Sequence, residues 1–343
     1  MANYTTINKS SLHMNTKLYT GNNTSQAITG VGFQPDWTWI KSITNTEQNN
    51  LFDAVRGSTK RLISDDTSAE WDSATNLTSF DSDGFTTSSS DGINDNSVNY
   101  ASWNWKANGA GSSNSDGSVT STVSVNTTAG FSIVKFNVGS SGGDITVGHG
   151  LGVVPKMIII KSRDDTYNWD VYHENVGNSK RLRLNTTDTQ SNSTFMSNTS
   201  PTSSVFTFKQ THYGTNSNAI AYCFNEIVGY SKFNTYNGNG NADGPMIYTG
   251  FKPSFIIIKK TSATDHWVLM DNKRQGYNFD NELLLPSDNR AEEDGASYGV
   301  DILSNGFKCR TTDGWTNASG QSYIYMAFGQ TIVGTNNVPA TAR

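Results

Sequence analysis

The stretch Gly32-Phe33-Gln34-Pro35-Asp36-Trp37-Thr38-Trp39-Ile40-Lys41 has two close relatives further along the chain. They are Gly152-Val153-Val154-Pro155-Lys156-Met157-Ile158-Ile159-Ile160-Lys161 and Gly250-Phe251-Lys252-Pro253-Ser254-Phe255-Ile256-Ile257-Ile258-Lys259. Each has Gly three residues before Pro and Lys six residues after it, which indicates an internal repeat. The triple-isoleucine runs are typical of strands buried on both faces, whereas Trp37-Thr38-Trp39-Ile40 alternates and predicts a half-exposed strand.

Similar residues flank these three stretches. Trp169 and Trp267 each follow the repeated lysine by eight residues, and we expect Phe52 to take this place in the first stretch. The segment Lys60-Arg61-Leu62 resembles Lys180-Arg181-Leu182, and Leu62-Ile63-Ser64-Asp65 resembles Leu284-Leu285-Pro286-Ser287. Each copy closes on an aromatic-rich segment. Proline at the entrance of a strand is tolerated because its missing N–H is not needed there.

These patterns predict an all-β fold made of three tandem related β-sandwich units of jelly-roll or lectin-like type. A propeller blade or solenoid coil has only about 20–50 residues, so the units are too long for either. We assign residues 1–107, 130–229 and 230–343 to the three units. Residues 108–129, rich in Gly, Ser and Asn, are expected to form a linker with one strand within 118–125. The second and third units are then rigidly docked, and the first is more independent.

Composition excludes several classes of protein. Lys and Arg number 25 against 30 Asp and Glu, a formal charge of −5 without a basic cluster, which disfavours nucleic-acid binding. No apolar run approaches the roughly 20 residues of a membrane-spanning helix, and the first residues lack the features of a signal peptide. Cys223 and Cys309 are too few for a disulfide framework or a zinc site. We therefore expect no membrane insertion, no metal and no cofactor.

Several longer phrases resemble a known family, the triply repeated β proteins of marine bacteriophages, including phages of cyanobacteria. They are Ile28-Thr29-Gly30-Val31-Gly32-Phe33-Gln34-Pro35, Val55-Arg56-Gly57-Ser58-Thr59-Lys60-Arg61-Leu62, Val147-Gly148-His149-Gly150-Leu151-Gly152-Val153-Val154-Pro155 and Tyr323-Ile324-Tyr325-Met326-Ala327-Phe328. The resemblance extends over residues 18–328. It implies a structural, tail-fibre-like virion protein that is assembled in the host cytoplasm, and it brings no catalytic residues.

Some residues resemble catalytic or metal-binding groups but are interpreted as structural. His149 lies between two glycines, yet no base, nucleophile or orienting partner is evident, so we predict a turn. Asp81-Ser82-Asp83-Gly84 resembles the start of a calcium loop but lacks its later ligands, and a plain turn is predicted. The repeated Lys41, Lys161 and Lys259 are expected to be surface charges at strand ends, with an interface salt bridge as the alternative.

The leading function is that of a non-enzymatic virion protein, a tail fibre or fibre-tip adhesin that contacts a host glycan or protein. The alternative is a capsid decoration or tail-assembly protein that binds other virion proteins, and a polysaccharide-cleaving enzyme is an outsider. The chain could form a homotrimer or a pseudo-threefold body that caps a trimeric shaft. Receptor contacts are expected where the copies diverge, in the loops that hold His212, Tyr213 and Trp315.

Overall fold

Strands make up nearly all of the regular structure, and the predicted all-β fold class is confirmed. The computed structural model describes residues 5–89, 92–274, 278, 281–333 and 339–342. Within these residues the helices are short: α1 (Gly295–Tyr298), α2 (Gly314–Asn317) and 3-10 turns at Ser10–Leu12 and Gln210–His212. Below, residues 5–107, 108–229 and 230–342 are called the first, second and third units.

Each unit packs a larger antiparallel sheet against a smaller one. In the first unit the larger sheet has the order β1 (Met14–Thr20), β9 (Asn99–Trp105), β3 (Trp37–Ser42), β4 (Asn50–Asp53), β5 (Gly57–Ile63) and β6 (Trp71–Asp72). Its smaller sheet has the order β2 (Gln26–Thr29), β8 (Gly84–Thr87) and β7 (Leu77–Asp81). The apolar faces of the two sheets enclose one buried cluster, as in a β-sandwich.

The second and third units are built in the same way. In the second, the larger sheet runs β10 (Ser112–Asn114), β11 (Ser121–Asn126), β12 (Phe131–Asn137), β19 (Asn218–Phe224), β14 (Met157–Ser162), β15 (Asp170–His173), β16 (Lys180–Arg183) and β17 (Ser191–Asn192), and the smaller pairs β13 (Asp144–Gly148) with β18 (Val205–Lys209). In the third, the larger sheet runs β20 (Ser231–Asn237), β27 (Ser322–Thr331), β22 (Phe251–Lys260), β23 (Trp267–Asp271) and β24 (Leu283–Leu284). Its smaller sheet runs β21 (Met246–Tyr248), β26 (Gly306–Cys309) and β25 (Val300–Leu303).

One strand order is common to the three larger sheets. The order β1-β9-β3-β4-β5 has its counterparts in β12-β19-β14-β15-β16 and β20-β27-β22-β23-β24. The residues two positions after the repeated prolines pair with the closing strand in every unit: Trp37 with Trp105, Met157 with Phe224, and Phe255 with Phe328. Trp105 and Phe224 end their strands, whereas β27 continues for three residues after Phe328. Positions in the three units can therefore be matched by register.

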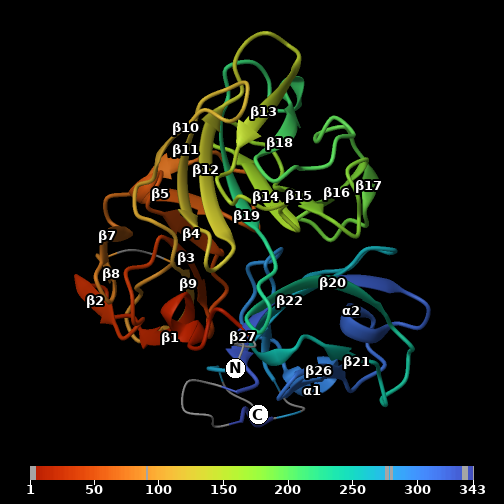
Figure 1. Cartoon of the computed structure of the whole chain (residues 1–343). Coiled ribbons are helices and arrows are strands. Elements are labelled where there is room, and N and C mark those ends of the chain that lie inside the picture. The colour runs from red at the N-terminus through yellow and green to blue at the C-terminus, as the bar shows by residue number, and fades with distance from the viewer. Residues whose placement is uncertain (1–4, 90–91, 275–277, 279–280, 334–338, 343) are drawn as a thin grey trace.

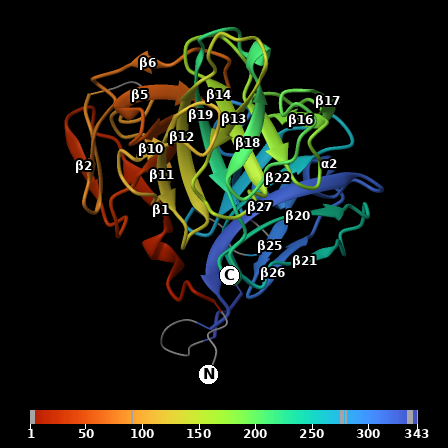
Figure 2. The ribbon, with the colours of Figure 1, turned by 45° about the horizontal axis from the view of Figure 1, so that its top comes forward.

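Residues 108–129 do not form a linker, and that assignment is corrected. β11 pairs with β12 along its whole length, and β10 pairs with β11, so this segment adds two strands to the second unit's larger sheet (Figure 2). The strand expected within 118–125 lies at β11. Repeated Ser, Thr and Asn residues resemble a linker in composition, but Val123 supplies a buried apolar contact to the sheet.

The central strand of each larger sheet is buried on both faces. Ile158 and Ile160 face the second unit's own sandwich core, while Ile159 between them faces the opposite way. β3 is also buried at all six positions, so the prediction of a half-exposed first strand is wrong. Its alternation is real, but Thr38 satisfies its hydroxyl by donating to Asn104 Oδ1 at 3.0 Å inside the sandwich.

The outer faces of the three larger sheets meet at the centre of the molecule and share one core (Figure 1). Aromatic rings from different units contact one another there: Trp37 with Tyr222 at 4.5 Å, Trp105 with Phe255 at 5.2 Å, and Phe224 with Phe328 at 6.1 Å between centroids. The first unit is therefore packed as tightly into the molecule as the others. The expectation that it is more independent is corrected.

Each junction between units also has a hydrogen bond at one matched position. Trp169 Nε1 donates to Ile63 O at 2.6 Å, and Trp267 Nε1 donates to Arg183 O at 2.7 Å. The matching residue of the first unit is Asn49, because it precedes Asn50, the partner of Ile40. Asn49 Nδ2 donates to Leu285 O at 3.0 Å across the third junction. Phe52, expected at this place, instead lies in the first unit's own core.

The three repeated lysines are buried, so their prediction as surface charges is wrong. Each ammonium donates to backbone carbonyls: Lys41 to Ser42 O at 3.0 Å, Lys161 to Ser162 O at 2.9 Å, and Lys259 to Thr187 O at 3.0 Å. The bond from Lys259 crosses from the third unit to the second. Burial lowers the pKa of each lysine to about 8, although nearby carboxylates raise it in part.

Candidate functional site

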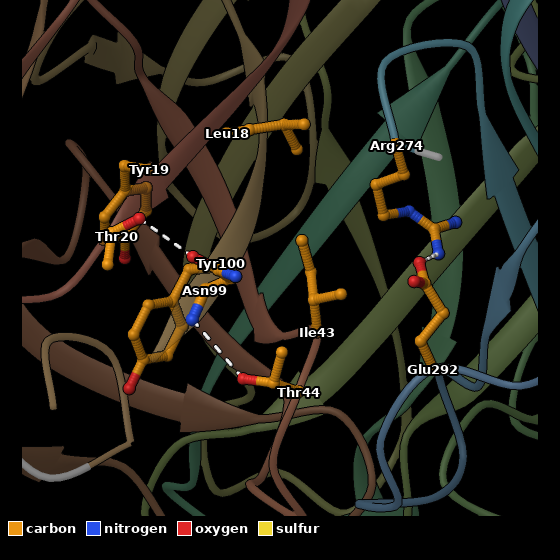
Figure 3. Close-up of a pocket in the computed structure, with 9 residues that line it drawn as sticks. All are labelled: Leu18, Tyr19, Thr20, Ile43, Thr44, Asn99, Tyr100, Arg274 and Glu292. Atoms are coloured by element: carbon orange, nitrogen blue, oxygen red, sulfur yellow. Dashed lines mark hydrogen bonds and ion pairs between the residues drawn. The ribbon is translucent and has the colours of Figure 1, made fainter. Parts of the chain in front are cut away.

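A groove of about 430 Å³ lies where the first and third units meet (Figure 3). It is lined by Leu18, Tyr19, Thr20, Ile43, Thr44, Asn99, Tyr100, Arg274 and Glu292. One wall comes from the edge strand β1, the start of β9 and the segment after β3. The other wall is the ion pair of Arg274 and Glu292 from the third unit. The groove is therefore completed only by the junction of two units.

The wall from the first unit has apolar side chains, Leu18 and Ile43, and the aromatic pair of Tyr19 and Tyr100 supports it from behind. Tyr19 stacks on Tyr100 with centroids 5.2 Å apart and an interplanar angle of 18°. The Tyr19 hydroxyl donates to Ile93 O at 2.6 Å, which fixes the ring against the first unit's own core. Leu18 projects from β1 with 37% of its surface exposed. This wall offers a surface on which an aliphatic group can pack.

The wall from the third unit carries both signs of charge. Arg274 Nε donates to Asp271 Oδ2 at 2.7 Å, and its Nη2 donates to Leu269 O at 3.2 Å. The same Asp271 oxygen accepts from Trp103 Nε1 at 3.0 Å, so the first unit helps to hold the carboxylate in place. Arg274 Nη1 in turn pairs with Glu292 Oε1. These bonds orient the guanidinium and place the Glu292 carboxylate at the groove.

The electrostatics of the groove favour ligands with a positively charged or hydrogen-bond-donating group. Arg274 is fully engaged with protein acceptors, while the Glu292 side chain keeps 17% of its surface exposed. Burial raises the pKa of Glu292, although the charge of Arg274 lowers it in part. Hydroxyl and amide groups of Thr20, Thr44 and Asn99 add neutral hydrogen-bonding sites on the opposite side. The arrangement suits non-covalent binding.

The sequence-predicted contacts His212 and Tyr213 lie in the second unit. Tyr213 is 1% exposed, and its hydroxyl donates to Ile160 O at 3.0 Å and to Asp170 Oδ2 at 3.1 Å. His212 Nε2 is 2.6 Å from the same carboxylate oxygen. A buried ring in this position cannot contact a partner, and the prediction for Tyr213 is corrected. The residue fills the end of the sandwich and fixes a buried carboxylate.

Trp315 lies apart from that cluster, in α2 of the third unit. Its ring stacks on Tyr298 with centroids 4.0 Å apart and an interplanar angle of 7°, and it meets His266 edge-on at 5.3 Å. Trp315 is partly buried, so one part of the ring remains accessible. The corresponding loop of the first unit begins at Ser90-Asp91, which lie outside the described residues. The structure thus separates Trp315 from His212 and Tyr213.

The turn predicted at Asp81-Ser82-Asp83-Gly84 is confirmed, whereas His149 lies in the irregular segment directly after β13. His149 is buried, accepts from Leu151 N at Nδ1 at 3.2 Å, and has Nε2 3.1 Å from Thr202 O. Asp83 accepts from Gly30 N at 2.9 Å and Gly32 N at 2.6 Å, so its carboxylate closes a turn. Among the described residues, no group of three or more His, Cys, Asp and Glu side chains is placed to hold a metal ion.

The sequence gives no direct signal for the groove. Its nine residues come from five separate stretches of the chain, at 18–20, 43–44, 99–100, 274 and 292. Arg274 follows Asp271 by three residues, as Arg56 follows Asp53, and this shared spacing is the one pattern that could have drawn attention to Arg274. Which groups face each other across the junction depends on the packing of the units.

The structure is thus an all-β protein of packed sandwiches with a groove where the first and third units meet. A family model described as a domain of unknown function (DUF7483) matches residues 9–331. The chain belongs to this family. A search of the curated proteins finds no match. Among the described residues, none of the helices has the length and apolar character needed to cross a bilayer.

Proposed function

We propose that this protein is a non-enzymatic structural component of a bacteriophage particle, either a tail fibre or a fibre-tip module that contacts the host surface. The proposal also takes the three units to be copies of one sandwich. It is supported by the resemblance of several phrases to triply repeated phage β proteins, which extends over residues 18–328, and by the strand order common to the three larger sheets.

The observation that carries most weight is the shared aromatic core. The outer faces of the three larger sheets are buried against one another in one core, which agrees with a single body of approximate threefold symmetry. The matched hydrogen bonds from Trp169, Trp267 and Asn49 repeat at each junction and agree with that arrangement. Such a body suits the end of a trimeric shaft, because one chain then offers three similar faces to three similar subunits.

Imaging of purified particles with and without this protein tests the proposal most directly. Density that is lost at the tip or side of the tail would support a fibre component. Density lost from the capsid surface would favour the alternative, a decoration protein, and density lost from inside the tail would favour an assembly role. Light scattering of the free protein adds its copy number: a monomer fits the capping body, and a trimer fits a homotrimeric fibre.

Trp315 provides a residue-level test of attachment. The variant W315A should weaken attachment to host cells or to a virion partner by about 2 kcal/mol, because a partly exposed aromatic anchor is typical of binding hot spots. The ring also stacks on Tyr298, so we measure the melting temperature in parallel and compare with Y298A, which removes the stacking partner but keeps the anchor. Unchanged attachment by W315A would remove this residue from the proposed contact.

A further inference from the structure

Glu70 and Glu292 occupy matched places at two different junctions. Glu70 N donates to Arg163 O at 2.7 Å across the junction of the first and second units. Glu292 N donates to Ile43 O at 2.9 Å across the junction of the third and first units. Both acidic side chains therefore start from the same backbone contact.

At the first of these junctions the carboxylate is held by two arginines. Arg163 binds Glu70 through two bonds, from Nε to Oε2 at 2.9 Å and from Nη2 to Oε1 at 2.6 Å. Arg56 Nη1 adds a third bond to Oε2 at 3.1 Å. This paired geometry is the strongest that an arginine makes with a carboxylate. The Glu70 side chain is consequently only 9% exposed.

At the second junction one of the two arginines is missing. Arg274 takes the place of Arg56, since each follows its anchoring aspartate by three residues. The residue matched to Arg163, however, is Ile43, whose side chain has no donor. Within the described part of the chain, Arg274 is the one cation that pairs with Glu292. Ile43 lines the groove, so the groove lies at the place that corresponds to Arg163.

The remaining junction shows that an unmatched acid is not a general feature of the fold. There Gln190 N donates to Thr261 O at 3.1 Å, in the same backbone contact. The side chain at this place is a neutral amide, and no arginine is needed to balance it. A carboxylate with only one of two possible arginine partners is therefore particular to the groove between the first and third units.

We propose that the groove binds the guanidinium group of an arginine side chain that a partner polypeptide presents. The guanidinium would pair with the Glu292 carboxylate as Arg163 pairs with Glu70, and the aliphatic stem would lie on Leu18 and Ile43. A planar group with paired donors fits beside Glu292 because the guanidinium of Arg163 takes the corresponding place beside Glu70. The inference goes beyond the proposed function, since it names a ligand group and holds whether or not the protein is part of a particle.

The charge state of the two carboxyls agrees with this arrangement. Burial raises the pKa of Glu70, but the hydrogen bonds from Arg163 and the charge of Arg56 outweigh it, and the pKa is lowered. At Glu292 burial prevails over the single arginine, and the pKa is raised. A bound guanidinium would replace the missing partner and stabilise the ionised form.

A titration monitored by methyl NMR tests the proposal on the full chain. The probe is arginine blocked at both ends, N-acetyl-arginine methylamide, and the signals of Leu18 and Ile43 should shift on binding. N-acetyl-citrulline methylamide, which has the same shape without the charge, should cause no shift. E292Q should bind the arginine probe at least about tenfold more weakly, as expected for the loss of a charge-assisted pair. E174Q, at an exposed acid that pairs with Lys156, is the matched control and should bind normally.

The variant I43R supplies a second readout. It restores at this junction the arginine that is present at the other, so it should fill the groove, abolish probe binding and raise the melting temperature. It also decides the matter if E292Q fails to fold. The proposal is wrong if the arginine probe causes no shift, if citrulline or blocked lysine binds equally well, or if only neutral sugars bind. It is also wrong if I43R still binds the probe.

Discussion

Arg163 and Glu70 join the second and first units through paired hydrogen bonds between largely buried groups. R163M keeps most of the side-chain volume but leaves Glu70 with Arg56 alone. We expect it to lower the free energy of unfolding by about 2–3 kcal/mol, because breaking one side of a buried pair leaves an under-compensated charge. Urea unfolding measures the change, and K156M at the exposed pair with Glu174 should cost less than about 1 kcal/mol.

The same pair gives a dependence on acid pH. The folded-state pKa of Glu70 is lowered from its ordinary value of 4.5, so its stabilisation is present above that pH and is lost as pH falls through the folded-state pKa. The stability difference between the unsubstituted protein and R163M should therefore shrink below pH 4.5. A constant difference down to acid unfolding would show that Arg163 acts through packing alone.

The buried lysines predict a pH dependence of the same sign in the alkaline range. Lys41, Lys161 and Lys259 have a pKa of about 8 in the folded protein against 10.5 ordinarily. Between these values the unfolded chain binds more protons, so the free energy of unfolding should rise with pH, by up to about 1 kcal/mol per pH unit for each lysine. Unfolding measured from pH 8 to 9.5 checks this, and K161M should reduce the slope. A slope that K161M leaves unchanged would contradict the assignment.

At the scale of elements, the behaviour of β11 distinguishes a paired strand from a flexible linker. Its pairing with β12 predicts that amide hydrogens within Ser121–Asn126 exchange slowly, at rates comparable with those of β12. Hydrogen exchange followed by mass spectrometry or NMR measures this directly. The exposed turn at residues 139–143, which belongs to the same unit, is the internal reference for fast exchange. Complete exchange of the β11 amides within seconds would show that this segment is a linker after all.

Strands with continuous apolar runs were predictable because burial on both faces leaves a mark in the sequence. Ile158-Ile159-Ile160 and Ile256-Ile257-Ile258 are buried as expected. β3 was not predicted correctly because its Thr38 is polar and yet buried, with its hydroxyl satisfied by Asn104 on the neighbouring strand. From the sequence alone a polar residue is predicted to be exposed, since a hydrogen-bond partner that is distant along the chain cannot be recognised.

At the scale of the whole molecule, the shared core predicts that the three units unfold together. Trp37, Trp103 and Trp105 cover no apolar surface of their own unit's smaller sheet, and instead pack in the common core. Calorimetry should therefore give a single transition, and residues 1–107 alone should fail to form a stable fold. A fragment with a dispersed NMR spectrum and its own melting transition would show that the first unit is independent.

Two features of this protein were determined by its sequence. The three proline-and-lysine stretches established the matched central strands, because short-range alternation and turn residues are local properties. Composition established an all-β chain. In contrast, Phe52 was expected at the position matched to Trp169 and Trp267, where the structure has Asn49. Asn49 is recognised there only by its hydrogen bond to Leu285 O, a residue 236 positions away.

Only the tertiary structure decided how the units meet and which groups face one another. Packing buried Lys41, Lys161 and Lys259 and brought Trp37 against Tyr222. It also made residues 112–114 and 121–126 strands of the second unit's larger sheet. It also placed Ile43 where an arginine stands at the neighbouring junction, which opens the groove beside Glu292. Contacts of this kind join distant parts of the chain, and their energies depend on desolvation and geometry that no local pattern encodes.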